Sequence, residues 1–421
     1  MQVAVIGAGY VGLVQAAGLA SLGHRVRVGE RDQARLELLS TGRIPFYEAE
    51  LEGLVNGGVA NGLLSFHSDN HQAVEAAQVI FIALPTPDRG DGSANTSYIE
   101  AALDEIGPRL EPGTVIALKS TVPVGSVRAF QQRLSRMGAN AEVISNPEFL
   151  REGSAVGDFL KPDRIVIGTR HQAAVELMLK VYQGLQAPVL VTDPVSAEMI
   201  KYASNAYLAT RITFANAIAN LCEQVGADSK DVLHGMGYDR RIGFHFLNPG
   251  PGYGGSCFPK DTSALVAIAD GAGYDFSLLR GVIQVNSLQR ERIITKVENL
   301  LGEIQGKAIA VWGLAFKAGT DDVRESPAVY LARELMARGG RVTAYDPKVV
   351  ELAGVDLAPS ALEAAKGADL LLIATEWPEF QGIDPADLLA AMEGDAVVDA
   401  RNLMDPAAMR ALGFRYSGVG R

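Results

Sequence analysis

The stretch GAGYVG at residues 7–12 constrains the fold of this 421-residue chain more than any other feature. It follows the apolar run VAVI and opens a segment of helical character, which places a GxGxxG pattern between a predicted strand and a predicted helix. Glycines in that context allow a tight turn, close helix–strand packing and the approach of backbone N–H groups to a pyrophosphate. The pattern predicts a dinucleotide site, with a Rossmann fold that binds no dinucleotide as the alternative. The glycines expected to bind the cofactor here are Gly7, Gly9 and Gly12.

The identity of the dinucleotide depends on the end of the second predicted strand, VRVGE at 26–30. A dinucleotide fold expects an acid there, about 20 residues after the glycines, to accept hydrogen bonds from the adenosine ribose. Glu30 occupies that position and favours NAD. Arg31 follows directly and would instead meet a 2′-phosphate, so NADP remains open.

Short apolar runs alternate with helical patterns at both ends of the chain. This alternation predicts an α/β fold with two Rossmann-like, doubly wound parallel sheets that are buried on both faces. The expected strands of the first sheet are 3–7, 26–30, 79–85, 114–120, 142–146 and 164–168. The second, smaller sheet is expected from 307–313, 341–347, 368–377 and 396–402, with a helix over 326–339.

Between these two parts the sequence is helical. Residues 196–226 contain no proline and end at Gly226, and residues 277–302 have a similar pattern. We therefore expect a dinucleotide-binding domain over 1–195, a central helical domain over 196–300 and a second Rossmann-like domain over 301–421. The long helix would serve as a dimer interface or as a connector within one chain.

Composition excludes several classes of protein. No run approaches the ~20 apolar residues that span a bilayer, and the N-terminus has no signal-peptide pattern. Two cysteines cannot build a disulfide framework, which favours the cytoplasm, and the six scattered histidines indicate no metal site. The net charge of −11 argues against nucleic-acid binding. We expect a small-molecule partner and no membrane.

The two cysteines have different surroundings. Cys222 lies in an apolar helical stretch and is predicted to be core. Cys257 lies in PGYGGSCFPKD, two residues before Pro259, and a proline is typical of the start of a helix. A thiol at a helix N-terminus has a lowered pKa, and the neighbouring glycines would leave room for a ligand. The alternative is a small buried residue in a tight turn.

A dinucleotide site combined with a nucleophilic thiol suggests a specific chemistry. The thiolate would add to an aldehyde formed by the first hydride transfer, and the thiohemiacetal would lose a second hydride to give a thioester, which water hydrolyses to an acid. Lys201 and Asn205 share a helix face and would stabilise an oxyanion, although a solvated lysine beside an amide is the alternative. Asp261 is the candidate base.

Eight ordered motifs resemble the UDP-glucose/GDP-mannose dehydrogenase family over nearly the whole chain. They are GAGYVG (7–12), PTP (85–87), STVPVG (120–125), NPEFLREG (146–153), PDRIVIG (162–168), AEMIKYASNAYLA (197–209), RIGFHFLNPGPGYGGSCFPKD (241–261) and GLAFKAGTDDVRESPA (313–328). The family oxidises a nucleotide sugar to its uronic acid with two NAD+. Its members usually carry aspartate where this chain has Glu30, which weakens the preference for NAD over NADP.

The resemblance implies a role for each matching residue. The catalytic residues would be Cys257, Lys201, Asn205 and Asp261, helped by Thr121 and Glu152. Besides the glycines of the turn and Glu30, the cofactor would contact Tyr10, Val11, Arg35, Thr86, Thr121, Glu152, Lys260 and Arg324. The substrate would contact Glu148, Phe149, Leu150, Arg151, Glu152, Lys201, Asn205, Phe246, Leu247, Asn248, Pro249, Gly250, Gly254 and Lys317. Arg241 would reach the site of the neighbouring subunit, which implies a homodimer.

Within the family, the PDRIVIG and FLNPGPGYGG runs resemble the UDP-glucose branch more than the GDP-mannose branch. The UDP-N-acetylmannosamine branch typically lacks SCFPKD. The resemblance thus implies oxidation of UDP-glucose to UDP-glucuronate. Two alternatives are a hydroxyacid dehydrogenase that transfers one hydride, which needs neither Cys257 nor the region 307–421, and a catalytically idle nucleotide-sugar sensor, which would lack the nucleophile or the lysine.

Overall fold

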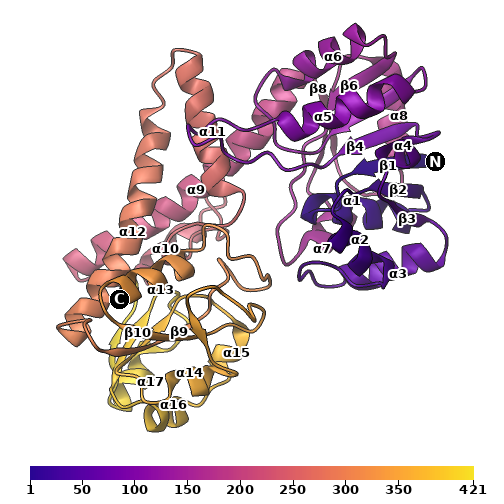
Figure 1. Cartoon of the computed structure of the whole chain (residues 1–421). Helices are drawn as coiled ribbons and strands as arrows, with labels where there is room; N and C mark the ends of the chain where they lie inside the picture. Colours follow the sequence, from indigo (N-terminus) through magenta and orange to yellow (C-terminus); the bar gives the residue numbers. More distant parts are fainter. The chain divides into compact units, whose positions relative to one another are not determined.

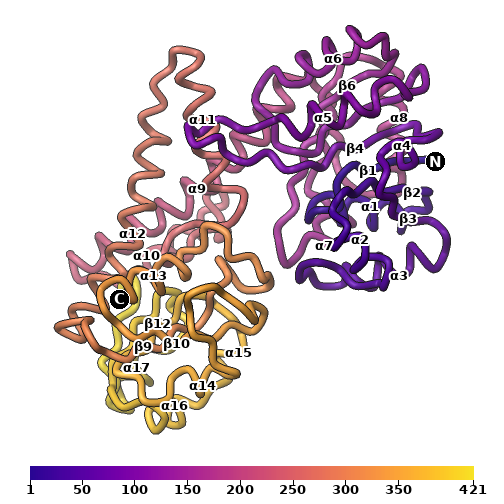
Figure 2. Tube along the Cα trace, in the orientation of Figure 1, coloured from indigo at the N-terminus to yellow at the C-terminus, as the bar shows by residue number.

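A computed structural model of the chain describes residues 1–421, which divide into two compact units (Figures 1 and 2). The first unit consists of Met1–Ser204 and Ala267–Gly273, and the second of Asn205–Val266 and Tyr274–Arg421. The boundary falls inside helix α9 (Pro194–Val225), the long helix expected over 196–226. The division into three domains remains a prediction.

The first unit contains an eight-stranded sheet in the order β3-β2-β1-β4-β5-β6-β7-β8. Its strands are β1 (Gln2–Ile6), β2 (Arg25–Gly29), β3 (Leu64–His67), β4 (Val79–Ile82), β5 (Thr114–Leu118), β6 (Ala141–Ser145), β7 (Ile165–Gly168) and β8 (Val189–Thr192). Its helices are α1 (Tyr10–Ser21), α2 (Gln33–Ser40), α3 (Leu51–Ala60), α4 (Asn70–Val74), α5 (Ser97–Ile106), α6 (Ser126–Arg136), α7 (Ala155–Leu160) and α8 (Gln172–Val181), with a 3₁₀ turn at Gly107–Arg109.

The core confirms that this sheet is buried on both faces. Along β1, Val3 and Val5 pack into one apolar cluster, whereas Ala4 and Ile6 pack into another, as the two-residue period of a strand requires. The predicted parallel pairing holds with one departure. The contact between β6 and β7 is a single antiparallel pair, Ser145 with Gly168, so β7 and β8 run opposite to the other strands.

The second unit contains a six-stranded parallel sheet in the order β11-β10-β9-β12-β13-β14. Its strands are β9 (Ala308–Trp312), β10 (Arg341–Tyr345), β11 (Asp356–Leu357), β12 (Leu370–Ile373), β13 (Ala396–Asp399) and β14 (Arg415–Ser417). The remaining helices of the chain are α10 (Ser229–Gly237), α11 (Phe258–Gly271), α12 (Ser277–Leu301), α13 (Pro327–Ala337), α14 (Ala361–Ala365), α15 (Pro378–Gln381), α16 (Pro385–Ala391) and α17 (Pro406–Ala411).

Both sheets reverse their strand order after the first strand, between β1 and β4 and between β9 and β12. Ligands of open α/β sheets bind at such switch points, outside the carboxyl ends of the strands. The likeness extends to the turns. Glu30 after β2 accepts the N–H of Ala8, and Asp346 after β10 accepts the N–H groups of Leu314 and Ala315. The similar element order of the two ends is therefore confirmed.

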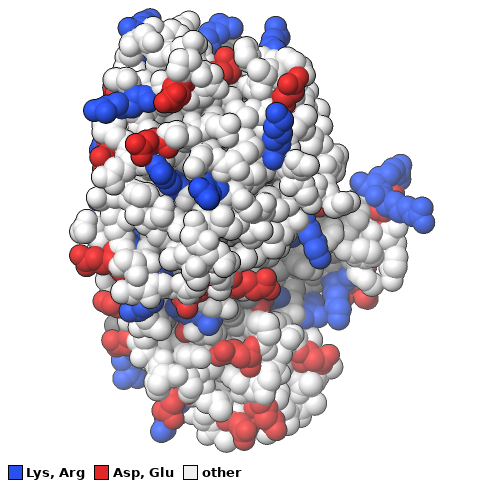
Figure 3. All heavy atoms as spheres, turned by 90° about the vertical axis from the view of Figure 1, so that its right-hand side faces the viewer, with Lys and Arg blue, Asp and Glu red and all other residues white.

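No helix of the chain is long and apolar enough to cross a membrane. On the face shown in Figure 3, Lys and Arg side chains are interspersed with Asp and Glu side chains.

Candidate functional site

The glycine turn between β1 and α1 is shaped by close packing. Gly7 has a φ of +99°, and a Cβ on Gly12 would lie 1.9 Å from the Gly7 carbonyl oxygen. Gly9 differs, because its φ is −72° and a Cβ there would meet nothing within 4 Å. Packing therefore does not explain Gly9. The open space before the uncapped first turn of α1 fits a pyrophosphate.

Glu30 lies at the end of β2 with a side chain that reaches back to the glycine turn. Its Oε2 accepts the Ala8 N–H at 2.9 Å and the Arg35 Nη1 at 2.8 Å, and its Oε1 accepts the Asp32 N–H at 2.9 Å. Burial alone would raise the pKa of Glu30, but these hydrogen bonds and the charge of Arg35 outweigh burial and lower it. The turn thus accommodates Glu30, which is longer than the usual aspartate, and keeps its carboxylate ionised.

Arg31, which left NADP open, is paired with Glu105 of α5 at 2.5 Å. The same carboxylate accepts the Nδ2 of buried Asn70 at 2.8 Å. The guanidinium is therefore held by an acid of its own chain, which supports NAD over NADP.

Thr86 and Thr121 follow the neighbouring strands β4 and β5, beside the switch point. The Thr86 hydroxyl donates to the Thr121 carbonyl oxygen at 2.9 Å. Two predicted cofactor contacts are thus joined at the carboxyl edge of the sheet.

The Lys201 ammonium and the Glu148 carboxylate form a buried ion pair, with Nζ 2.7 Å from Oε1. The Glu148 Oε2 accepts the N–H of Leu150 at 2.6 Å. Burial would raise the pKa of Glu148, but the charge and hydrogen bond of Lys201 and the Leu150 N–H lower it overall. Lys201 is 4% exposed and Asn205 is 6% exposed, so the solvated alternative is wrong.

The rest of the NPEFLREG segment is fixed by cations and acids of the same unit. The centroid of the Phe149 ring lies 3.6 Å from the Arg164 guanidinium carbon and 5.6 Å from the Lys201 Nζ. Arg151 is paired with Asp158 at 2.5 Å, so its guanidinium is already occupied.

Glu48 is a residue that the sequence did not indicate. Its buried carboxylate accepts the Tyr10 hydroxyl and the N–H groups of Gly153 and Ala155. Burial raises the pKa of Tyr10, and the charges of Glu48 and Glu152 add to that rise. Glu48 thereby ties the end of the NPEFLREG segment to the start of α1 and keeps Glu152 near the dinucleotide turn.

In the second unit Cys257 directly precedes α11, as predicted. Its carbonyl oxygen accepts the first helical hydrogen bond, from the Asp261 N–H at 2.9 Å. Its Sγ lies 3.6 Å from the Ser256 hydroxyl, and the side chain is partly exposed, unlike buried Cys222. Neither cysteine forms a disulfide.

Asp261 is 1% exposed and lies between two donors. The Asn205 Nδ2 and the Lys260 Nζ are each 2.6 Å from one of its carboxylate oxygens. The structure therefore brings together three of the predicted residues, Asn205, Lys260 and Asp261, and Asp261 lies one helical turn after Cys257. The Lys260 ammonium, predicted to contact the cofactor, forms an ion pair with Asp261.

Buried amides that the sequence analysis missed hold the backbone of the 246–255 loop. Gly250 donates its N–H to the Asn216 Oδ1 at 2.7 Å and accepts the Gln289 Nε2 at 2.9 Å. Asn286 bonds both the N–H and the carbonyl of Tyr253, at 2.8 and 3.1 Å. The sequence signal that could have indicated these residues is the presence of amide side chains on the buried faces of α9 and α12.

The glycines of this loop do not leave room for a ligand, which corrects our expectation. A Cβ on Gly254 would lie 2.2 Å from the Glu325 carbonyl oxygen, and one on Gly255, with its φ of +81°, would lie 2.9 Å from the Phe316 ring. They allow the loop to pack against the segment that follows β9.

Of the remaining predicted residues of this unit, Arg241 and Arg324 are exposed, whereas Lys317 is partly buried and Leu247 is buried. Arg241 pairs with Asp239, with a side chain that is 89% exposed, and Arg324 pairs with Asp322. The Lys317 Nζ lies 5.6 Å from the Phe316 ring centroid.

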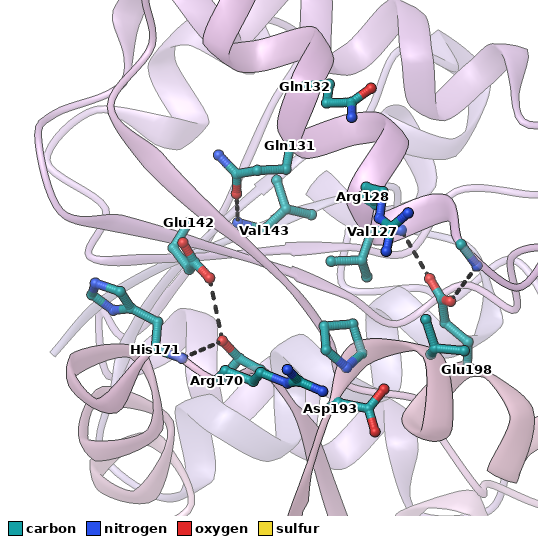
Figure 4. Close-up of a pocket in the computed structure, with 14 residues that line it drawn as sticks. Val127, Arg128, Gln131, Gln132, Glu142, Val143, Arg170, His171, Asp193 and Glu198 are labelled. Atoms are coloured by element: carbon teal, nitrogen blue, oxygen red, sulfur yellow. Dashed lines mark hydrogen bonds between the residues drawn. The ribbon is translucent and has the colours of Figure 1, made fainter.

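A pocket of about 590 Å³ lies elsewhere in the first unit (Figure 4). It is lined by α6, β6 and the start of α9 and contains Arg128, Arg170 and His171, but none of the predicted site residues. The Glu198 carboxylate points to the N-terminus of α6 and accepts the N–H groups of Gly125 and Val127. That helix end is therefore occupied.

Known protein families and relatives match this chain over most or all of its length. Three domain models of the UDP-glucose/GDP-mannose dehydrogenase family match: the NAD-binding domain at 1–186, the central domain at 195–288 and the UDP-binding domain at 310–406. The UDP-glucose 6-dehydrogenase of Rhizobium meliloti (strain 1021) is 46% identical over 435 residues, which cover all of both chains.

Two solved structures share the fold. A UDP-glucose dehydrogenase from Pyrobaculum islandicum has a TM-score of 0.93 at 39% identity and covers 99% of this chain and 97% of its own. A UDP-D-ManNAc dehydrogenase from Pyrococcus horikoshii has a TM-score of 0.90 at 27% identity and covers 100% and 99%.

Proposed function

Because this chain belongs to the UDP-glucose/GDP-mannose dehydrogenase family, we propose that it oxidises UDP-glucose to UDP-glucuronate with two NAD+. The cofactor is NAD, which accepts a hydride in each of the two oxidations. Two observations support the glycine turn as its site: a Cβ on Gly9 would meet nothing within 4 Å, and the Glu30 carboxylate accepts the Ala8 N–H of the turn. Glu30 would accept hydrogen bonds from the ribose, and Arg35, Thr86, Lys260 and Arg324 are proposed as further contacts.

The arrangement of Asn205, Asp261 and Lys260 after Cys257 carries the proposal. A carboxylate at 1% exposure with two donors at 2.6 Å is held in one orientation by groups of its own chain. The alcohol at C6 first loses a hydride and a proton to give an aldehyde. The Cys257 thiolate then adds to the aldehyde carbon, and the lysine and amide of α9 stabilise the oxyanion.

The thiohemiacetal loses the second hydride and a proton and becomes a thioester. Asp261 takes a proton from the attacking water, and hydrolysis of the C–S bond releases the acid and restores the thiol. Thr121 and Glu152 are proposed to assist these proton transfers. A single-hydride enzyme would need neither the thiol nor this base.

The substrate residues are proposed from the same family pattern. Residues 246–250, whose Gly250 is held by Asn216 and Gln289, would bind the nucleotide sugar together with Gly254 and Lys317, and the segment 148–152 would cover it. The division into domains 1–195, 196–300 and 301–421 and a cytoplasmic location remain part of the proposal.

A homodimer is also proposed, and the surface of α9 in the second unit supports it. Tyr207, Phe214 and Leu221 are spaced seven residues apart and are 61, 48 and 56% exposed. A heptad stripe of exposed apolar side chains is typical of a helix that packs against another helix. Arg241, at 89% exposure, would then reach the site of the partner subunit.

The test is a count of reduced cofactor. Purified protein is incubated with UDP-glucose, GDP-mannose or UDP-N-acetylmannosamine, each with NAD+ or NADP+. We expect two NADH per UDP-glucose consumed, with UDP-glucuronate as product. Cys257→Ser should form no acid, whereas Cys222→Ser, at the other cysteine, should keep the stoichiometry of two. One NADH per sugar with an aldehyde product would refute the proposal, and a faster reaction with GDP-mannose would move the chain to that branch.

A further inference from the structure

Lys119 is a buried lysine for which the proposed reaction gives no role. It directly follows β5 and is 6% exposed, and its backbone N–H donates to the Ile82 carbonyl oxygen at 2.9 Å. Burial of an ammonium group costs free energy unless it is compensated. A lysine at this position therefore does not stabilise the fold through its charge, and its presence calls for a functional explanation.

The Lys119 side chain contacts a buried polar network. Its Nζ donates to the Asn146 Oδ1 at 3.3 Å and to the Tyr182 hydroxyl oxygen at 3.5 Å. The Tyr182 hydroxyl donates to the same Asn146 oxygen at 2.6 Å and accepts the Gln15 Nε2 at 3.3 Å. The Asn146 side chain is completed by a bond from Nδ2 to the Val166 carbonyl oxygen at 2.7 Å.

Asn146 begins the segment that carries Glu148. Its backbone N–H donates to the carbonyl oxygen of Leu118, the residue before Lys119, at 2.9 Å. Lys119 thus holds the side chain of Asn146 by a hydrogen bond, and Leu118 holds its backbone. Two residues later, the Glu148 carboxylate holds the Lys201 ammonium at 2.7 Å.

The charges around Lys119 are unbalanced. The titratable groups that face it are Glu148, Lys201 on α9 and Tyr182 after α8, so two lysines share one carboxylate. Burial lowers the pKa of Lys119 to about 7, with Glu148 opposing and Lys201 adding to the shift. Arg164, which also acts on Glu148, adds a further cation. Near pH 7 the amine is therefore about half protonated, and above that pH it is increasingly uncharged, so that its contacts are ordinary hydrogen bonds.

We propose that Lys119 is a positioning residue, which holds the Lys201 ammonium in place through Asn146 and the Glu148 carboxylate. This rests on the proposed function, in which Lys201 stabilises the oxyanion. Protonation of Lys119 adds its positive charge to those of Lys201 and Arg164, which already act on Glu148, and so weakens the hold of Glu148 on Lys201. Activity should then fall as the pH drops through neutrality.

The first test measures stability against pH with Lys119→Met and, as control, Lys180→Met at an exposed lysine at the end of α8. A depressed folded-state pKa against about 10.4 in the unfolded chain means that wild-type stability rises with pH above 7. We expect Lys119→Met to be more stable than the wild-type protein at pH 7. The ratio of the two unfolding equilibrium constants should fall towards pH 9, by up to about tenfold per pH unit. A gain that does not change with pH would overturn the proposal.

The second test measures the oxidation of UDP-glucose between pH 6 and 9. Lys119→Met should lower kcat at least tenfold and keep KM within about threefold. Its activity should no longer fall as the pH drops below about 7, so the acid limb of the pH profile should be lost. Tyr182→Phe removes the other donor to Asn146 but leaves the lysine, so it should keep that limb. Lys119→Met with wild-type kcat and pH profile would contradict the proposal. A wild-type protein that oxidises no UDP-glucose would refute the proposed function, and this inference with it.

Discussion

Buried side chains of the candidate site are held by partners of their own chain. Asp261 is fixed by Asn205 and Lys260, and Glu148 by Lys201 and a backbone N–H. Donors and charges that are oriented before the ligand arrives need no reorganisation during the reaction. The sequence could predict these residue types, but it could not show which donor meets which carboxylate, because the partners are separated by more than 50 positions in two of the pairs.

Glu30 is predicted to set the choice of dinucleotide. Glu30→Ala removes a charged acceptor from the ribose position, and such a hydrogen bond contributes about 1.5–3 kcal/mol, so NAD+ should bind about ten- to a hundredfold more weakly. NADP+ should lose less, because Glu30 also repels a 2′-phosphate. Calorimetric titration of both cofactors measures this without turnover. Arg31→Ala, which removes the arginine paired with Glu105, should leave NAD+ binding unchanged. Equal losses for both cofactors would contradict this role.

Strands at the sheet centres could be predicted from the sequence, whereas strands at the edges could not. Every expected strand is present, and the four that were missed, β3, β8, β11 and β14, are the outermost strands of the two sheets. A central parallel strand is buried on both faces and therefore forms a continuous apolar run. The edge strands β3, β11 and β14 contain polar residues, LSFH, DL and RYS, and β8 is largely exposed. Periodicity gives no signal for them.

The glycines of the 246–255 loop were misread for a related reason, since a sequence shows flexibility but not proximity. Gly254→Ala would bring a Cβ against the Glu325 backbone at 2.2 Å and should cost about 1–3 kcal/mol of stability. Gly235→Ala is the matched control, because it lies in exposed α10 with nothing within 4 Å. It should stabilise the protein by about 0.5–1 kcal/mol. Urea unfolding monitored by circular dichroism decides between these signs, and two variants of equal stability would refute the packing argument.

At the scale of the whole molecule, the exposed stripe on α9 predicts a dimer. Phe214→Glu places a charge in the middle of the stripe and should convert a dimer of about twice the 44.7 kDa chain into a monomer. Leu412→Glu, at a residue that is 42% exposed after α17, should leave the dimer intact. Light scattering during gel filtration measures the mass. If Phe214→Glu keeps the wild-type mass, the dimer does not use this stripe.

The central claim is that Cys257 holds the substrate covalently between two oxidations. Asp261→Asn should slow hydrolysis about 10²- to 10⁴-fold and let the thioester accumulate. The variant is mixed with UDP-glucose and NAD+, quenched in acid and digested, and its peptides are measured by mass spectrometry. The account predicts a UDP-glucuronyl adduct on the peptide that contains Cys257, released by hydroxylamine. UDP-glucuronate formed at the wild-type rate with Cys257 unmodified, or an adduct on another residue, would contradict it.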